Sequence, residues 1–187
     1  MCLLPAGLVD ANVEIFATEI YGKCKATFQG KVVEFWDLPS EITSSIEDEA
    51  LADKKAMATF KEDGVTELRT IVESWAWCNL GRYDSTPDYT TTTGEVRKEF
   101  YDCGRRGKCA NEFRRCSKVV VGDTYLTARE TECARLMAQG FADKEIADEM
   151  GLQEVSMISL SQRVREKVGA RNRVDVAIWA NKNGLID

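Results

Sequence analysis

Four cysteines are the residues in this sequence that most directly suggest chemistry. Cys103, Cys109 and Cys116 lie within fourteen residues of one another, and twenty-four residues separate Cys78 from the first of them. Four thiolates satisfy a tetrahedral zinc ion, and a [4Fe–4S] cluster uses the same ligand set. Neither gap inside the group is as short as the about two to four residues of a zinc knuckle. The segment is therefore expected either to hold a metal, with structural zinc favoured over an iron–sulfur cluster, or to carry unligated thiols.

Basic side chains surround these cysteines. Residues 103–118 contain six of them and a single acid, Glu112, whereas the whole chain has a formal net charge of −6. The six are Arg105, Arg106, Lys108, Arg114, Arg115 and Lys118. A local basic loop can meet phosphate while an acidic face of the same protein points away. If a metal orders this loop, its cations are expected to contact nucleic-acid phosphates, and otherwise the loop is a solvated basic surface.

The composition argues against an enzyme. The chain has no histidine, which removes the usual general base and every Ser-His or Cys-His scheme. It also lacks a phosphate-binding loop and a paired-carboxylate motif. The odd count of seven cysteines argues against a disulfide framework. No apolar run approaches the roughly 20 residues that span a bilayer, and the start of the chain is a poor signal peptide, so a cytoplasmic protein without a membrane partner is expected.

The first 81 residues are expected to form a small α+β domain. Ile20–Phe28 and Lys31–Trp36 are rich in aromatic and β-branched residues, and Gln29-Gly30 between them predicts a hairpin turn. A helix is expected from Ser40 or Ser44 to about Phe60, and a second over Thr66–Asn79. Residues 82–122 are expected to be an irregular, cysteine-rich basic segment that holds the metal site.

Residues 123–187 are expected to form an all-α, four-helix domain. Thr127 followed by Glu130 fits a capping box at the start of the first helix. Asp143 is expected to cap the second helix, and Gly151 to turn the chain into the third, as in a helix-turn-helix. The expected ranges are 128–139, 143–150, 154–168 and 173–183. On the third helix an apolar stripe is expected to pack inward: Met157, Leu160, Val164 and Val168.

Several separated blocks of this region resemble the LuxR-type (GerE, NarL) DNA-binding domain. They agree in order and spacing over about a third of the chain, and consist of Leu126–Glu132, Ala138–Gly140, Asp143–Ala147, Glu166–Arg173, Ala177 and Gly184–Ile186. Upstream, the run Tyr101-Asp102-Cys103 followed by the basic run Gly107-Lys108-Cys109 and then by this domain is similar to regulators found in bacteria and their phages. The resemblance implies a transcription regulator whose partner is double-stranded DNA.

The family also implies roles for individual residues. Its third helix lies in the major groove, and its fourth often mediates dimerisation. By position, Ile158, Ser159 and Gln162 would face the base edges. Gln162 suits adenine, and Ile158 suits a thymine methyl group. The expected phosphate contacts are Lys144, Ser156, Arg163, Lys167 and Arg171.

Two departures from the family keep a second hypothesis open. The family usually has lysine at the position of Ile158 and histidine at the position of Leu160. Each lost cationic contact weakens DNA binding and lowers its salt dependence. Leu160 fits the inward stripe, whereas Ile158 lies about 100° from Met157 around the helix. The alternative is an adaptor that uses a degenerate helix-turn-helix to bind a protein such as RNA polymerase or another regulator.

Overall fold

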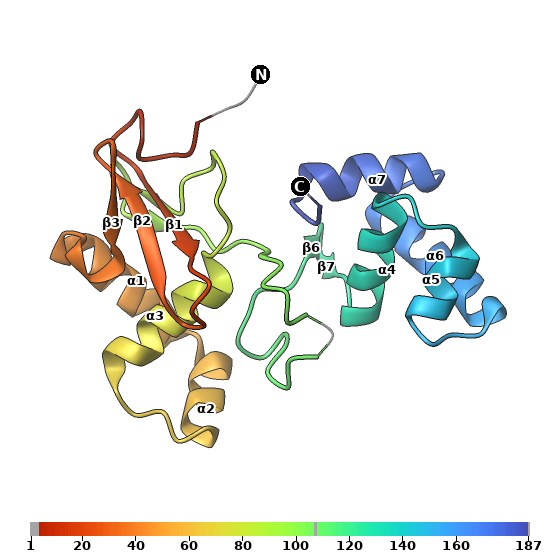
Figure 1. The fold of residues 1–187 in the computed structure, drawn as a ribbon, viewed down its shortest axis with the longest axis horizontal. Helices are drawn as coiled ribbons and strands as arrows, with labels where there is room; N and C mark the ends of the chain where they lie inside the picture. Colours follow the sequence, from red (N-terminus) through yellow and green to blue (C-terminus); the bar gives the residue numbers. More distant parts are fainter. Residues whose placement is uncertain (1–3, 107, 187) are drawn as a thin grey trace. The chain divides into compact units, whose positions relative to one another are not determined.

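The computed structural model describes residues 4–106 and 108–186 of the chain (Figure 1). They divide into two compact units, which are described separately. The N-terminal unit contains residues 1–103 and 113–117, and the C-terminal unit contains residues 104–112 and 118–187. The segment 82–122, expected to form a part of its own, is shared between these two units.

The N-terminal unit is built on a five-stranded antiparallel sheet in the order β3-β2-β1-β4-β5. The strands are β1 (Val13–Ala17), β2 (Cys24–Phe28), β3 (Lys31–Glu34), β4 (Tyr89–Thr90) and β5 (Glu95–Val96). β1 pairs with β2 along its whole length, but it meets β4 at only one residue pair, Val13 with Tyr89. The expected α+β character is confirmed. The sequence patterns predicted only β2 and β3, and two of the three missed strands, β4 and β5, are only two residues long.

The predicted hairpin turn is confirmed. Gln29 and Gly30 both have positive φ, 50° and 76°, and Phe28 pairs directly with Lys31 across the turn. Two central residues in the left-handed region match the twist of the flanking strands, as a type I′ turn requires.

Three helices and one short 3-10 turn complete this unit. They are η1 (Phe35–Asp37), α1 (Ser40–Ala52), α2 (Lys54–Glu62) and α3 (Leu68–Asn79). The single helix expected up to Phe60 is wrong, because Asp53 leaves the helical conformation (ψ 76°) and its side chain accepts a hydrogen bond from Ala56 N at 3.1 Å. An aspartate that caps a new helix satisfies a backbone donor that the first turn leaves without a partner. The residue before α1 is Pro39, and no serine side chain caps that helix.

The core of the unit lies between the sheet and its helices. Contacts join α3 to β1 and β2, and α1 to α3, and Figure 1 shows β1, β2 and β3 side by side. The largest side chains with no appreciable exposure come from several of these elements and include Trp75, Phe35, Phe60 and Ile15. Trp75 and Trp77 on α3 are packing residues, because they are 0% and 5% exposed.

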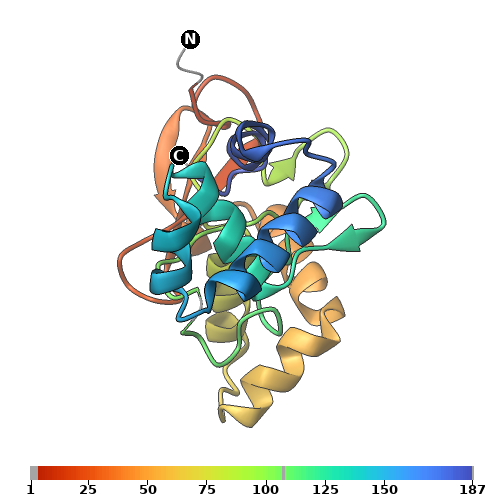
Figure 2. The ribbon, with the colours of Figure 1, turned by 90° about the vertical axis from the view of Figure 1, so that its right-hand side faces the viewer.

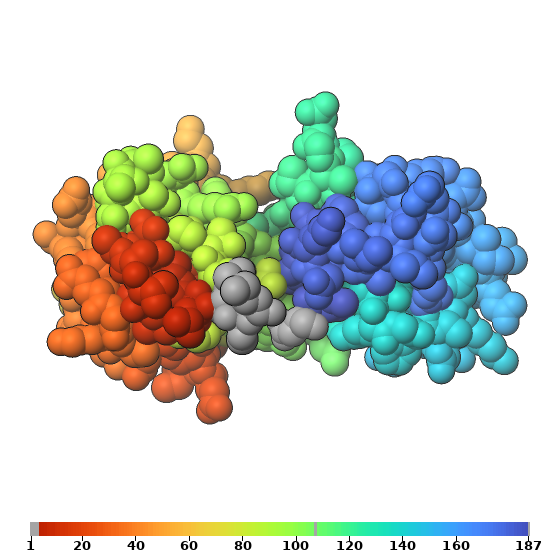
Figure 3. Space-filling view, turned by 90° about the horizontal axis from the view of Figure 1, so that it is seen from above, coloured from red at the N-terminus to blue at the C-terminus, as the bar shows by residue number. Residues whose placement is uncertain are grey.

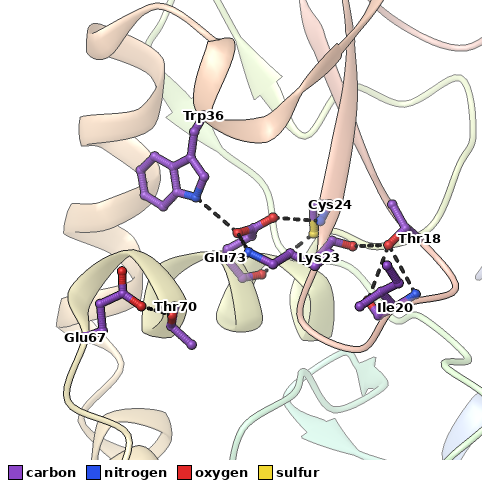
Figure 4. A network of polar contacts seen from close by, with 8 residues as sticks. All are labelled: Thr18, Ile20, Lys23, Cys24, Trp36, Glu67, Thr70 and Glu73. Atoms are coloured by element: carbon purple, nitrogen blue, oxygen red, sulfur yellow. Dashed lines mark hydrogen bonds and ion pairs between the residues drawn. The ribbon is translucent and has the colours of Figure 1, made fainter.

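One buried acid ties α3 to the sheet. Glu73 is 4% exposed, and its Oε1 accepts a hydrogen bond from Cys24 N at 3.1 Å. Its Oε2 accepts from Lys23 Nζ at 2.9 Å and from Trp36 Nε1 at 3.1 Å (Figure 4). Both oxygens are therefore satisfied, which a buried carboxylate needs in order not to destabilise the fold.

The stretch Phe113–Ser117 is held against α2 by two arginines. The Arg115 guanidinium donates to Thr59 Oγ1 and Asp63 Oδ2, both at 2.8 Å, and lies 3.8 Å from the centre of the Phe60 ring. Arg114 Nη2 donates to both carboxylate oxygens of Glu62 at 2.7 Å. These two cations, expected to contact phosphate, are bound within the N-terminal unit.

The C-terminal unit begins with a short hairpin and is otherwise helical. Its elements are β6 (Val120–Val121), β7 (Thr124–Tyr125), α4 (Ala128–Ala138), α5 (Asp143–Glu149), α6 (Glu154–Val168) and α7 (Arg173–Lys182). All four helices lie within one residue of the ranges expected from the sequence. α4 packs against α6 and α7, and α5 packs against α6. Figure 2 looks onto this unit, with α6 as the long blue helix near the centre. Among the described residues no helix is long and apolar enough to cross a membrane.

A second group of acids is buried in the N-terminal unit where β1 meets the chain around β4. Glu14 is 0% exposed; its Oε1 accepts from Asp84 N at 2.6 Å, and its Oε2 has no partner within the described residues. Asp88 Oδ2 accepts from Ile15 N at 2.7 Å, and Glu99 Oε1 accepts from Arg82 N at 2.8 Å. Asp88 is also buried, at 3% exposed, whereas Glu99 is half-buried.

Burial raises the pKa values of this group. Loss of solvent raises the pKa of Glu14 to about 9 and that of Glu99 to about 8. Burial, and then the neighbouring charges of Glu14 and Glu99, raise the pKa of Asp88 well above its usual value. A carboxyl group with a raised pKa binds a proton in the folded state at pH values where the unfolded chain has lost it. Its stabilising effect is therefore full at low pH and is lost as the pH rises through the folded pKa.

We expect Glu14→Gln to stabilise the N-terminal unit at pH 8 and to flatten its pH dependence. Glutamine resembles the protonated acid and has no ionised form to bury. In the natural chain each such group lowers the unfolding free energy by up to about 1.4 kcal/mol per pH unit between its unfolded and folded pKa values. Amide hydrogen exchange of peptides covering β1 and β4, from pH 5 to pH 9, measures this. The control is Glu19→Gln, at an exposed acid; an equal shift in both variants would contradict the expectation.

Candidate nucleic-acid interface

The capping box expected at the start of α4 is confirmed. Glu130 N donates to Thr127 Oγ1 at 3.4 Å, and Thr127 N donates to Glu130 Oε2 at 2.8 Å. Two of the backbone donors that a helix start leaves unsatisfied are therefore paired. This fixes the direction in which the chain enters α4.

The same carboxylate binds the last turn of α6. Lys167 Nζ donates to Glu130 Oε2 at 2.7 Å and to Tyr125 O at 3.1 Å. Glu130 is only 4% exposed. Burial acts to raise the pKa of Glu130, but the hydrogen bonds from Lys167 and Thr127 outweigh it and hold the pKa below its usual value. Lys167, expected to contact phosphate, is half-buried and bound within the unit.

Glycine closes both helices of the helix-turn-helix. Gly151 (φ 62°) follows α5, where Leu152 N donates to Ala147 O at 2.8 Å, and Gly169 (φ 69°) caps α6. A residue with a side chain adopts this left-handed conformation only with strain.

The cap expected for α5 differs in the structure. The capping residue is Ala142 rather than Asp143, and Ala142 N donates to Glu145 Oε2 at 2.6 Å. Asp143 occupies the first helical position, and its Oδ1 accepts from Arg173 Nη1 at 2.8 Å. The acid predicted as a cap therefore joins α5 to α7 instead.

The inward stripe of α6 is confirmed. Met157, Leu160 and Val164 are 1%, 4% and 0% exposed, while Val168 is half-buried. Ser161, 5% exposed, also faces inward, and its hydroxyl lies 3.9 Å from the Met137 sulfur. Leu160 is therefore a core residue, which accounts for an apolar side chain where the family usually has histidine.

The outward stripe contains the three residues expected at base edges and one that the sequence reasoning left out. Ile158 is 58% exposed, and Ser159 and Gln162 are exposed as well. Val155 is 75% exposed. At 100° per residue, these four side chains fall within an arc of about 100°. The spacing of Val155 from Ile158 and Ser159, three and four residues, is the signal that would have identified it.

The two polar side chains of this stripe are bound to their own helix. Ser159 Oγ donates to Val155 O at 3.1 Å, and Gln162 Nε2 donates to Glu166 Oε1 at 2.8 Å. Such exposed contacts one helical turn apart are weak, about 0.2–0.5 kcal/mol. Gln162 can therefore exchange its bond to Glu166 for a base at small cost.

The residues expected to contact phosphate are mostly accessible. Lys144, Ser156 and Arg163 are exposed, and within the described ranges no hydrogen bond or ion pair engages their side chains. Arg171 is exposed, and its backbone N and Nε both donate to Asp175 Oδ2 at 3.1 Å. Of the five expected phosphate contacts, only Lys167 is committed to the interior of the unit.

The cysteines expected to bind metal are half-buried. Cys78, Cys103 and Cys116 belong to the N-terminal unit, and Cys109 belongs to the C-terminal unit. In the part of the chain that the structure describes, no group of three or more histidine, cysteine or acidic side chains is arranged to hold a metal ion. Cys133, outside this group, is 0% exposed, and burial raises its pKa to about 12.

Comparison with known proteins identifies the C-terminal region. Residues 124–180 match the family model of the bacterial regulatory proteins of the luxR family. The matched residues contain β7, the helix-turn-helix and most of α7. No curated protein and no solved structure is similar enough to the chain to match it.

We expect Glu130→Gln to destabilise the C-terminal unit by about 2 kcal/mol, because it leaves the partly buried Lys167 without its counter-charge. In the natural chain the lowered pKa of Glu130 gives stability that is present above about pH 4.5 and is lost as the pH falls through the folded pKa. The variant should lack this loss. Amide hydrogen exchange of peptides covering α4 and α6 reports both effects.

The matched control is Glu132→Gln on the same helix. Glu132 pairs with Arg135 at 2.6 Å, but both side chains are a quarter or more exposed. A surface pair of this kind contributes about 0–1 kcal/mol. Equal losses in the two variants would show that Glu130 has no special position.

Proposed function

We propose that this chain, which carries a LuxR-family helix-turn-helix domain at residues 124–180, regulates transcription by binding double-stranded DNA in a sequence-specific way. The family match makes it a DNA-binding transcription regulator in general terms. The observation that carries the specific proposal is the outward stripe of α6, which leaves the side chains expected at base edges exposed on the helix that the family inserts into the major groove.

Two kinds of contact are proposed. Gln162 suits adenine, whose N6 and N7 pair with a side-chain amide, while Ile158 suits a thymine methyl group. Lys144, Ser156, Arg163 and Arg171 would bind phosphates and set the register of α6 on the duplex. Lys167 is left out of this set, because the hydrogen bonds to Glu130 and Tyr125 use its ammonium group.

A homodimer through the last helix is part of the proposal. On α7, Val174 is 66% exposed and Ile178 is 50% exposed, and Ala177 lies between them at helical spacing. Figure 3 looks onto the face of the C-terminal unit to which α7, in dark blue, contributes much of the surface. Burying such a stripe against its own copy would place two recognition helices on two half-sites about one helical turn of DNA apart.

A specific observation favours the alternative function, an adaptor that binds RNA polymerase or another regulator. Val155 and Ile158 are apolar and exposed, and the exposed acids Glu154 and Glu166 lie on the same helix. Apolar surface of this kind also marks protein-binding sites. In that case Ile158→Asp would abolish a protein complex, and neither the natural chain nor the variant would bind DNA.

Metal binding by the cysteine-rich segment stays a prediction, with zinc as the expected ion. Elemental analysis of the purified chain should give about one zinc per chain if four thiolates bind it tetrahedrally. Cys103→Ser and Cys116→Ser should lower this content, whereas Cys133→Ala should not, because Cys133 is buried inside the C-terminal unit. Iron with sulfide would instead indicate a cluster, and a metal-free protein with intact folding would refute both.

The DNA proposal predicts that the full chain selects one motif from a random pool of duplexes and that retention weakens as salt rises.

Arg163→Ala should reduce affinity severalfold and lower the salt slope by about 0.9, the value of one phosphate contact. Gln162→Ala should relax base preference at one position, worth about 1–3 kcal/mol. The control is Lys182→Ala, which removes one exposed positive charge from the end of α7. No retention even at low salt would refute the proposal, and a single unpaired half-site would refute the dimer.

A further inference from the structure

The first two turns of α6 present an aliphatic pair that the fold does not require. Val155 and Ile158 are three residues apart, so their side chains are neighbours on the helix surface. They are 75% and 58% exposed, while the core contacts of the helix come from Met157, Leu160 and Val164 on the opposite side. Both are β-branched, and β-branched residues favour a helix less than straight chains do. Neither packing nor helix formation explains them.

The polar chemistry on the same stripe is limited. The Ser159 hydroxyl donates to Val155 O, and the Gln162 amide donates to Glu166 Oε1, at 3.1 Å and 2.8 Å. Ile158 stands where the family usually has lysine, so the stripe also lacks a cation there. On this stripe, the first two turns of α6 therefore offer mainly apolar contact. In the major groove the apolar group that a base pair presents is the C5-methyl of thymine.

We infer that Val155 and Ile158 read thymine methyl groups as a pair, so that the target site carries two neighbouring thymines facing the start of α6. This inference rests on the proposed function and names the feature of the DNA that the site selects. DNA is favoured over protein as the partner of this pair, because Val155 and Ile158 lie in the same arc of the helix as Ser159 and Gln162, which are proposed to face the base edges. The exposed side chains of Arg163 on the same helix and Lys144 on α5 provide positive charge for the phosphates.

The test replaces single thymines of the selected site by deoxyuridine, which removes the methyl group and keeps the hydrogen-bonding groups. Affinities of the full chain are measured by titration for each substituted duplex. At two neighbouring positions the loss should be about fourfold each, the value of one buried methyl or methylene group. Deoxyuridine at the other thymines of the site should have little effect and serves as the control for changes in DNA shape.

Variants assign the effect to the pair. Val155→Ala and Ile158→Ala should each abolish the preference for thymine over deoxyuridine at one position, while binding to the fully substituted site changes little. Val120→Ala is the matched control, because Val120 is a 67% exposed valine on β6. It should keep both preferences.

The outcomes distinguish failure of the thymine-methyl inference from failure of the proposed function. Binding that is equal for thymine and deoxyuridine at every position overturns the inference and leaves the regulator intact. Preferences that persist in both alanine variants overturn it as well. Absence of binding to any duplex at low salt overturns the proposed function together with the inference, and loss of a protein complex on Ile158→Asp would then identify the pair as a protein contact.

Discussion

The arrangement of the C-terminal unit depends on one buried carboxylate. Glu130 is almost inaccessible to solvent, and an ionised group at such a position destabilises a fold unless hydrogen bonds replace its water. It meets that requirement with the backbone of Thr127 at the start of α4 and with Lys167 in the last turn of α6. Because both partners belong to helix ends, the contact fixes how α4 and α6 lie against each other. The inward stripe of Met157, Leu160 and Val164 then decides which face α6 turns outward.

The N-terminal unit buries acids in two contrasting ways. Glu73 has a donor for each oxygen, including an ammonium group, and it holds α3 against the sheet. Glu14 has one oxygen without a partner among the described residues, and the charges of Glu14 and Glu99 add to burial in raising the pKa of Asp88. The second arrangement is most stable with its protons in place, because burial and neighbouring negative charges raise the pKa values of its carboxyl groups. Within the N-terminal unit, therefore, the buried acids differ in whether the fold supplies a hydrogen-bond donor to each carboxylate oxygen.

Helix α6 shows why two departures from the family pattern in one motif have different physical consequences. Both Ile158 and Leu160 replace polar residues that the family usually has, and they are only two positions apart. Leu160 is buried against the other helices of the unit, so its apolar character stabilises the fold. Ile158 is exposed, so its apolar character changes what the surface can recognise. Exposed cations are found instead at Arg163 on the same helix and at Lys144 on α5.

The sequence by itself determined the elements whose causes are local. The capping box of Thr127 and Glu130, the turn at Gln29-Gly30 and the periodic inward stripe of α6 all depend on residues a few positions apart, and the structure has them as predicted. The LuxR-type blocks located the DNA-binding domain for the same reason, because their residues and spacings all lie in one continuous region of the chain. The sequence pattern also placed Ile158, Ser159 and Gln162 on the outward face.

Only the tertiary structure decided the partners of charged side chains. The sequence pattern predicted the same phosphate-contacting role for Lys167 and Arg163. In the structure Lys167 binds Glu130, thirty-seven residues away, whereas Arg163 is exposed. Arg114 and Arg115 likewise find acids fifty-two residues away on or just beyond α2, and Asp143 meets Arg173 instead of capping its helix. The strands β4 and β5 were not predicted, because a two-residue strand is too short to show an alternating hydrophobic pattern. A long side chain pairs with whatever charge the fold brings within about 4 Å, and that distance does not exist until the chain is folded.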